Sequence, residues 1–478
     1  MANDPRPFPD PTARALHEAL VAAEQPHLAD HWSRLDGAGR GRLAEQARGI
    51  DWHLVGALAR RVREHRLHPS AAGHDLAAAV TPECIPLRGE GEATRAALGR
   101  AALAAGAVGA ILVAGGQGTR LGCTGPKGLC TVGPLSKATL FDVLLGRLVA
   151  TRRRCGRGVP LAIMTSSATD ADTRRYLEEH GWCGLDPADV FLFRQQDLPA
   201  FDATSGDVLL DGPDHLALAP DGHGGMLSAL AAAGGLDWFR RRGVGHVVSF
   251  QIDNPLALPL DPAFLGAHLG ADAEFTLQVV HKRDPAEKVG VVVTSGGVTR
   301  IVEYSDLPAE SAAERLADGR LRFHAGSIAV HAFALGFLER CATRDDALPL
   351  HAARKAVPCL DADGLRIAPR VPNAIKFERF IFDILPLARR TCLVEIDPAE
   401  GFAPLKNPSG APGDSPEHVR AAQLAHARAV LARAGVQVAD GIDVELDAAT
   451  VLDADDVPLP VGTRIDRPTV VRGPRGSN

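Results

Sequence analysis

The sequence predicts a doubly wound α/β fold at the centre of the chain, with a helical region before it and a small domain after it. From Val108 onward, short apolar runs alternate with helix-length amphipathic segments, which is typical of parallel βαβ units. One of these runs leads directly into a glycine-rich loop. The chain has 478 residues, too many for one hydrophobic core, so we expect more than one domain.

Residues 1–105 are expected to form the helical region. Apolar residues recur there at helical spacing, as in Ala13-Leu16-Leu20 and Leu54-Leu58-Val62, and no run of β-branched residues indicates a strand. The first thirty residues are rich in proline and charge and lack the pattern of a signal peptide. We therefore expect a cytoplasmic protein.

Residues 106–390 are expected to form the α/β domain. The predicted strands are 109–114, 160–165, 190–193, 245–252 and 274–280, and the predicted helices include 139–154, 170–180 and 225–241. Strand-like runs on both sides of Ser295-Gly296-Gly297 predict a β-hairpin over 290–304, an antiparallel insertion covering a site.

Residues 391–478 are expected to form the small C-terminal domain. A loop rich in proline and glycine at 407–418 is followed by a helical pattern over 417–434. The remaining residues alternate Val, Leu and Asp in short strand-like pieces.

Composition narrows the classes of function. The formal net charge of −6 argues against a nucleic-acid partner, because neutralising phosphates requires clustered Lys and Arg. The eight cysteines include no Cys-x-x-Cys pair, and we expect isolated reduced thiols. The longest uncharged stretch, 101–119, consists largely of alanine and glycine, so we expect a buried strand and loop there and no membrane span.

The glycine-rich loop is the strongest functional signal. The run Ile111–Ala114 is followed by Gly-Gly-Gln-Gly-Thr-Arg-Leu-Gly over 115–122, and then by Pro126-Lys127-Gly128. Glycines let backbone N–H groups approach a triphosphate, while Arg120 and Lys127 add positive charge. The sequence fits neither the dinucleotide fingerprint nor the P-loop. The alternative is a glycine-rich turn with two solvated cations.

Asp253 follows the apolar run 246–252 and should lie at the carboxyl end of a central strand. Open α/β sheets bind ligands at that edge. A carboxylate there suits Mg²⁺, which takes one or two carboxylates together with substrate phosphates. The alternative is a helix cap before Pro255.

Residues 114–128 resemble the signature of the UDP-sugar pyrophosphorylases, in particular the eukaryotic-type UDP-N-acetylhexosamine pyrophosphorylases. The similarity extends, in order, over roughly residues 105–410 through Ile163–Ser166, Leu198–Ala200, Ala219–Gly222, Asp253-Asn254, Val302–Ser305, Ala325-Gly326, Ile375-Lys376, Phe382–Ile384 and Pro404–Asn407. The resemblance implies a nucleotidyltransferase domain that uses Mg²⁺ to join UTP and a sugar 1-phosphate, releasing pyrophosphate.

The resemblance also implies the site residues. Those at the nucleotide are Ala114, Gly115, Gly116, Gln117, Gln195 and Gly222, those at the phosphates are Arg120, Lys127, Lys376 and Lys406, and those at the sugar are His223, Glu303, Tyr304, Gly326 and Ser327. Some have ordinary alternatives: Gln195 as a surface amide, Gly222 as a turn glycine and Glu303 on the solvated face of an edge strand. Lys376 and Lys406 can each be ordinary surface lysines. Asp383 is expected to be structural.

Two residues depart from the pattern of the resembled enzymes and leave the identity of the sugar open. Ser327 stands where the resembled enzymes carry an asparagine that contacts the acetamido group, and His223 replaces another asparagine and matches the UDP-glucose branch. We expect UDP-N-acetylglucosamine as the product, with UDP-glucose or a broad set of UDP-sugars as the alternative. A non-catalytic sugar-nucleotide sensor is the alternative from another class. The oligomeric state is not predicted.

Overall fold

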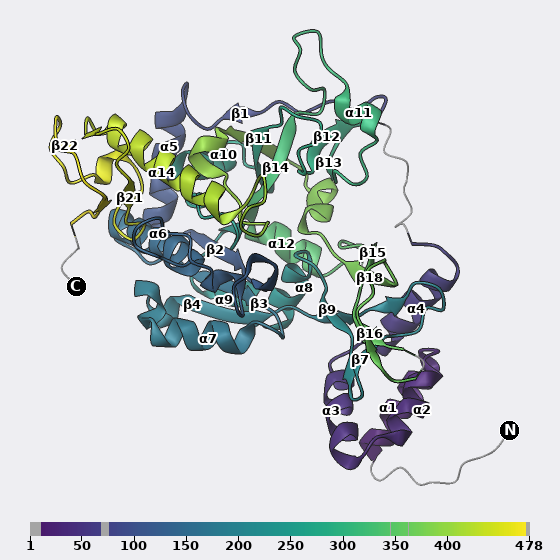
Figure 1. Cartoon of the computed structure of the whole chain (residues 1–478). Helices are drawn as coiled ribbons and strands as arrows, with labels where there is room; N and C mark the ends of the chain where they lie inside the picture. The colour runs from purple at the N-terminus through teal and green to yellow at the C-terminus, as the bar shows by residue number, and fades with distance from the viewer. Residues whose placement is uncertain (1–10, 68–75, 345, 362, 475–478) are drawn as a thin grey trace, which may run out of the picture. The chain divides into compact units, whose positions relative to one another are not determined.

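The computed structural model describes residues 11–67, 76–344, 346–361 and 363–474 (Figure 1). The chain divides into two compact units. The smaller unit contains Met1–Gly73, Gln196–Gly225 and Leu348–Phe380, and the larger contains His74–Gln195, Met226–Ala347 and Ile381–Asn478. The domain boundaries expected from the sequence, at residues 105 and 390, remain a prediction.

The larger unit is built on a mixed sheet that has ten strands within the described residues. Across the sheet lie β1 (Ile85–Pro86), β19 (Thr391–Ile396), β11 (Phe275–His281), β14 (Ala325–Ala334), β10 (His246–Gln251), β2 (Val108–Val113), β3 (Leu161–Thr165) and β4 (Val190–Arg194). Neighbours pair in parallel except at β14, which is antiparallel to both β10 and β11. The five strands predicted for the α/β domain are thereby confirmed.

The predicted hairpin is also confirmed. Strands β12 (Val291–Ser295) and β13 (Val298–Val302) pair in antiparallel register, and Val291 of β12 pairs with Gly326 of β14. The short helix α11 (Ala309–Ala313) follows the hairpin. The hairpin therefore extends the sheet beside β14.

The helices of the larger unit connect its strands. They are α5 (Glu92–Ala105), α6 (Leu140–Cys155), α7 (Asp170–Glu179), α9 (Gly235–Arg241), α10 (Pro262–Gly270) and α12 (Leu335–Ala342), and α8 (Gly225–Ala232) begins at the end of a smaller-unit segment. Short 3₁₀ turns lie at Thr119–Leu121, Lys127–Leu129, Gly181–Gly184, Pro187–Asp189, Ile381–Leu387 and Ala454–Asp456. The single helix predicted over 225–241 is wrong, because Gly234 adopts a left-handed φ of 78° and separates α8 from α9.

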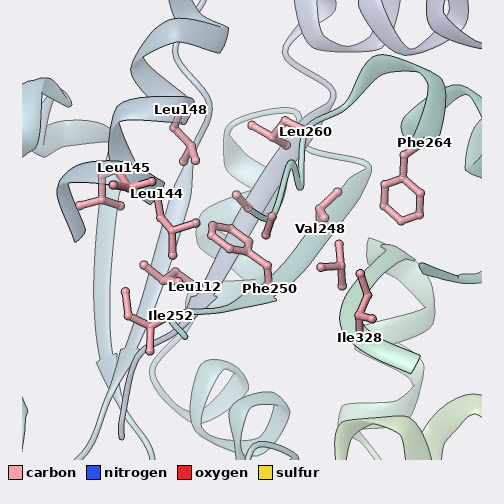
Figure 2. Close-up of a cluster of buried hydrophobic side chains, with 14 of the residues drawn as sticks. Leu112, Leu144, Leu145, Leu148, Val248, Phe250, Ile252, Leu260, Phe264 and Ile328 are labelled. Atoms are coloured by element: carbon pink, nitrogen blue, oxygen red, sulfur yellow. The ribbon is translucent and has the colours of Figure 1, made fainter. Parts of the chain in front are cut away.

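The main core of this unit lies between the sheet and its helices. Figure 2 shows Leu144 and Leu148 of α6 gathered around Leu112 of β2 and Phe250 of β10. These side chains are at most 1 % exposed. Strands buried on both faces read as continuous apolar runs, which is why β2 and β10 could be predicted closely. This core fixes the carboxyl ends of the two strands that lead into the site.

The C-terminal elements also belong to the larger unit. Helix α13 (Pro398–Gly401) follows β19, and α14 (Pro416–Arg433) confirms the predicted helix. Two small parallel pairs follow: β20 (Gln437–Val438) with β22 (Arg464–Ile465), and β21 (Val444–Leu446) with β23 (Thr469–Val471). Residues 475–478 lie outside the described part of the chain.

The smaller unit contains the N-terminal helices. They are α1 (Pro11–Ala22), α2 (Pro26–Arg34), α3 (Gly37–Arg48) and α4 (Trp52–Arg63). Its strands pair as β15 (His351–Lys355) with β18 (Ala374–Glu378) and β6 (Phe201–Asp202), β5 (Asp197–Pro199) with β9 (Leu218–Pro220), β7 (Leu210–Gly212) with β8 (His215–Leu216), and β16 (Cys359–Leu360) with β17 (Arg366–Ile367). Helix residues such as Trp32 and Leu58 share one core with Phe201 and Phe377.

The predicted helical region needs one correction. Between residues 76 and 91, the chain forms turns and the short strand β1, because Pro82, Pro86, Gly89 and Gly91 oppose a helix. Residues 1–10 and 68–75 of that region lie outside the described residues. None of the described helices has the length and apolar character needed to cross a membrane. The stretch 101–119 forms the end of α5, then β2, then a loop.

Candidate active site

The candidate site lies at the carboxyl edge of the sheet in the larger unit. Strands β2, β3, β4 and β10 run in parallel, so the residues that follow them meet at one edge. Ala114 follows β2, Ser166 follows β3, Gln195 follows β4, and Asp253 lies just beyond β10. Ligands of open α/β sheets bind at such an edge.

The glycine-rich loop folds back on itself. The backbone N–H of Gly118 donates to the carbonyl of Gly125 at 2.8 Å, and that of Lys127 donates to the carbonyl of Gly116 at 2.9 Å. Arg120 is exposed on the 3₁₀ turn Thr119–Leu121 and makes no hydrogen bond or ion pair with any residue that the structure describes. The loop thus presents a cation and exposed backbone at the sheet edge.

Gln195 packs against the start of this loop. A Cβ added to Gly115 would lie 2.6 Å from Gln195 Nε2. Ser166 Oγ, just after β3, donates to the Gly115 carbonyl at 2.8 Å and so holds the start of the loop against the end of that strand. Gln195 is only 5 % exposed, so its interpretation as a surface amide is wrong. Its contact with the uracil remains a prediction.

A disulfide closes the same loop. Cys123 and Cys130 are bonded, with their Cα atoms 5.6 Å apart, and the expectation of reduced thiols is wrong for this pair. Their positions differ by seven in the sequence, and the fold of the loop brings the two sulfur atoms together. Cys84, Cys155, Cys183, Cys341, Cys359 and Cys392 are free, as expected.

Lys127 and Asp253 meet across the site. Lys127 Nζ lies 3.7 Å from Asp253 Oδ2, and the two side chains are 19 % and 12 % exposed. The backbone N–H of Leu405 donates to the Asp253 carbonyl at 2.7 Å, which brings the segment carrying Lys406 to the same place. The exposed Lys406 ammonium lies 6.0 Å from the centre of the Phe402 ring. Lys127 and Asp253 thus lie together, and the backbone of the segment that carries Lys406 lies beside them.

The donor set around Asp253 is compatible with a magnesium ion that arrives with its nucleotide. Among the residues that the structure describes, no group of three or more His, Cys, Asp or Glu side chains is arranged to hold a metal. Mg²⁺ keeps several waters and needs only one or two protein carboxylates when phosphates supply the other oxygens. A single carboxylate at the sheet edge fits that mode of binding.

The sugar-binding candidates of the larger unit surround Gly290. The Ser327 N–H donates to the Gly290 carbonyl at 2.8 Å, and a Cβ on Gly290 would lie 3.1 Å from Glu303 Oε1. Gly326 precedes Ser327 on β14, and Tyr304 is 47 % exposed. The structure therefore brings the predicted Glu303, Gly326 and Ser327 together, and Gly290 is a neighbour that the sequence did not single out.

Gly222, His223 and Lys376 belong to the smaller unit. Gly222 has a φ of 87° and approaches the backbone so closely that a Cβ would lie 2.5 Å from the Arg379 carbonyl oxygen, so it is a turn glycine in conformation. The His223 ring lies 5.4 Å from that of Phe380, and burial lowers its pKa to about 4, which keeps it neutral near pH 7. Lys376 lies on β18, two residues before its end.

An ion pair stabilises the turn at Gly222. Arg379 Nη1 lies 2.9 Å from Asp221 Oδ2, and the Gly224 N–H donates to the Arg379 carbonyl at 2.8 Å. Burial raises the pKa of Asp221 to about 6, although Arg379 acts in the opposite direction. The turn that carries Gly222 and His223 is therefore fixed from the end of β18.

Lys282 is a further residue at this edge, and no sequence pattern singles it out. It follows β11 at the carboxyl edge of the sheet, and its backbone N–H donates to the His324 carbonyl at 2.7 Å. Its side chain is 1 % exposed, and burial lowers the pKa of the ammonium. In the sequence, Lys282 is only a charged residue just after the strand-like run 275–280. That pattern is too common to predict that the lysine side chain is buried.

The chain is similar to known enzymes over most of its length. Residues 96–410 match the sequence model of the UTP–glucose-1-phosphate uridylyltransferase family. A human protein named UDP-N-acetylhexosamine pyrophosphorylase-like protein 1 is 36 % identical over 438 residues, covering 88 % of this chain and 86 % of that protein. The UDP-N-acetylglucosamine pyrophosphorylase of Saccharomyces cerevisiae is 36 % identical over 382 residues, covering 78 % of this chain and 80 % of the yeast enzyme.

A solved structure agrees with the fold. The uridine diphosphate N-acetylglucosamine pyrophosphorylase from Trypanosoma brucei, crystallised with an inhibitor, superposes with a TM-score of 0.80 at 25 % identity. The match covers 97 % of this chain and 99 % of the trypanosome chain. The predicted nucleotidyltransferase-like α/β fold and the family resemblance carried by residues 114–128 are both confirmed. The chain belongs to the UTP–glucose-1-phosphate uridylyltransferase family.

Proposed function

We propose that this chain transfers the uridylyl group of UTP to a sugar 1-phosphate, preferably N-acetylglucosamine 1-phosphate, and releases pyrophosphate. The observation that carries the proposal is the meeting of the glycine-rich loop with Asp253, where Lys127 Nζ lies 3.7 Å from the carboxylate. The family match and the names of the relatives support the same reaction. We place the enzyme in the cytoplasm, where UTP is available.

The reaction is an in-line substitution at phosphorus. An oxygen of the sugar 1-phosphate forms a bond to the α-phosphorus of UTP, and the bond from that phosphorus to the β-phosphate oxygen breaks. The electron pair of the broken bond leaves with pyrophosphate. The attacking phosphate is already ionised at neutral pH, so no general base is required. Catalysis therefore depends on positioning and charge stabilisation.

The cations of the loop supply that stabilisation. Arg120 is exposed and ready to bind phosphate oxygens, and Lys127 is held beside Asp253 by the backbone hydrogen bond to Gly116. Lys406 adds a third charge in the larger unit, and we propose the same role for Lys376. A Mg²⁺ ion held by Asp253 and the phosphates would neutralise charge as it shifts toward the leaving group.

Base and sugar recognition are assigned to the remaining residues. We propose that Gln195 and Gly222 contact the uracil, that the backbone of 114–117 holds the nucleotide, and that Glu303, Tyr304, Gly326, Ser327 and His223 face the sugar. The shorter Ser327 side chain predicts only a modest preference for the acetamido sugar. A UDP-glucose or broad-specificity enzyme is the alternative that His223 and the family description favour.

Pyrophosphate release from UTP tests the proposal. The purified chain is incubated with UTP and Mg²⁺, without a sugar phosphate and then with N-acetylglucosamine 1-phosphate, glucose 1-phosphate or galactose 1-phosphate. Release that depends on a sugar phosphate supports the transferase. Binding of UDP-N-acetylglucosamine with no release in any mixture would point to a non-catalytic sensor.

A further inference from the structure

The loop after β10 carries the proposed metal ligand, and its conformation is not set by the ion pair that Asp253 makes. Residues 253–257 form this loop, named here the acidic loop. Lys127 Nζ is 3.7 Å from the Asp253 carboxylate, too far for a well-formed hydrogen bond. The direction of the carboxylate therefore depends on what holds the backbone of the acidic loop.

Arg147 on α6 holds one end of the acidic loop. Its Nη2 donates to the Pro255 carbonyl at 2.8 Å, and its Nη1 donates to the carbonyls of Leu256 at 3.2 Å and Ala257 at 3.0 Å. Among the described residues it forms no ion pair with a carboxylate, unlike Arg154 on the same helix, which pairs with Asp453 and Asp456. The charged guanidinium of Arg147 thus donates hydrogen bonds to three consecutive backbone carbonyls of the acidic loop.

Asn254 holds the other end. This residue is 3 % exposed, and its Nδ2 donates to the Gly401 carbonyl at 2.8 Å. Its Oδ1 accepts from the backbone N–H of Ala403 at 3.0 Å and of Leu256 at 3.3 Å. Asn254 therefore joins the acidic loop to the segment 401–406, which ends in Lys406.

We infer that Arg147 and Asn254 are positioning residues that fix Asp253 and Lys406 for the proposed transfer. Mg²⁺ demands nearly ideal octahedral geometry and takes only one or two protein carboxylates, so its binding should be sensitive to the direction of the Asp253 carboxylate. Residues that orient a metal ligand typically change metal affinity by about 10-fold to 100-fold when they are removed. The inference rests on the proposed function, because it assumes that Asp253 meets a metal–nucleotide complex.

The test compares Arg147→Met and Asn254→Ala with the parent. Mn²⁺, which reports on Mg²⁺ sites, is titrated in the presence of UTP and followed by electron paramagnetic resonance. We expect the Kd of Mn²⁺ to rise about 10-fold in both variants and kcat to fall about 10-fold, with a smaller change in KM. Arg154→Met is the matched control, because it removes an arginine of α6 that does not touch the acidic loop, and it should alter neither quantity.

Thermal unfolding separates positioning from simple loss of structure. Arg147→Lys is included as the milder variant, since it keeps the charge and a donor but loses the fork that spans three carbonyls. Variants that remain folded at the assay temperature yet bind Mn²⁺ with UTP as tightly as the parent would overturn the inference. If the parent itself releases no pyrophosphate, the proposed function fails instead, and the Mn²⁺ titration still reports whether these residues orient Asp253.

Discussion

Substituting Gly115 by alanine tests whether Gln195 holds the nucleotide. The new Cβ would lie 2.6 Å from Gln195 Nε2, whereas ordinary contacts begin near 3.4 Å, so the amide must retreat by about 0.8 Å. The nearest atoms belong to a flexible side chain, and Gly115 has no left-handed φ, so the loop backbone need not move.

The displaced amide should weaken UTP binding. Loss of one hydrogen bond to the base costs roughly 1 kcal/mol, which corresponds to about a fivefold rise in the KM for UTP. Steady-state kinetics at saturating sugar phosphate measures this change, and kcat should change little because the amide is assigned to the base.

A double-mutant cycle decides the cause. In the Gln195→Ala background there is no amide to displace, so Gly115→Ala should have almost no further effect. If the fivefold penalty persists in that background, the added methyl acts on the loop or on Ser166, and the assignment of Gln195 to the base loses its support.

Four further substitutions address the phosphates, the metal, the sugar and the loop. Lys127→Ala should lower kcat/KM about 100-fold, and a near-normal rate would show that Lys127 is only a partner of Asp253. The Asp253→Asn variant should keep the melting temperature of the parent but require a higher Mg²⁺ concentration for activity. If activity depends on Mg²⁺ as it does in the parent, the role of Asp253 is structural. Ser327→Asn should raise the ratio of kcat/KM for N-acetylglucosamine 1-phosphate over glucose 1-phosphate by about fivefold, from roughly 1 kcal/mol of direct bonding, and an unchanged ratio would mean that Ser327 does not face the 2-position. Replacing Cys123 and Cys130 by serine should lower the free energy of unfolding by about 2 kcal/mol and abolish its response to reducing agent in denaturant titrations. Equal stability with and without the disulfide would contradict that estimate.

The sequence was most informative where one local pattern determines one element. Strand β10 was predicted over 245–252 and spans His246–Gln251, because a short, largely apolar run bounded by glycine and aspartate is typical of a strand whose centre is buried. Asp253 and the glycine-rich loop could be placed at the sheet edge for the same reason. The break at Gly234 was missed because an isolated glycine is tolerated within a helical pattern, and its left-handed conformation depends on packing.

Features that depend on distant residues could not be predicted. Nothing local in Ala325–Ala334 indicates that this strand enters the sheet in the antiparallel direction between β10 and β11. The bond between Cys123 and Cys130 is local in sequence, but it requires a loop conformation, fixed by the hydrogen bonds of Gly118 and Lys127, that no sequence pattern specifies. The burial of Lys282 likewise depends on elements packed from elsewhere in the chain.

The composition of the smaller unit has a consequence for how the protein is made. Helices α1–α4 are synthesised before the segments that complete their core, because that core includes Phe201 and Phe377, from segments that end at Gly225 and Phe380. Their apolar faces therefore stay incompletely covered until residues 348–380 have been synthesised. Contacts so distant in sequence slow folding and expose apolar surface to aggregation. Helices α1–α4 should therefore benefit from a chaperone while the later segments are being synthesised.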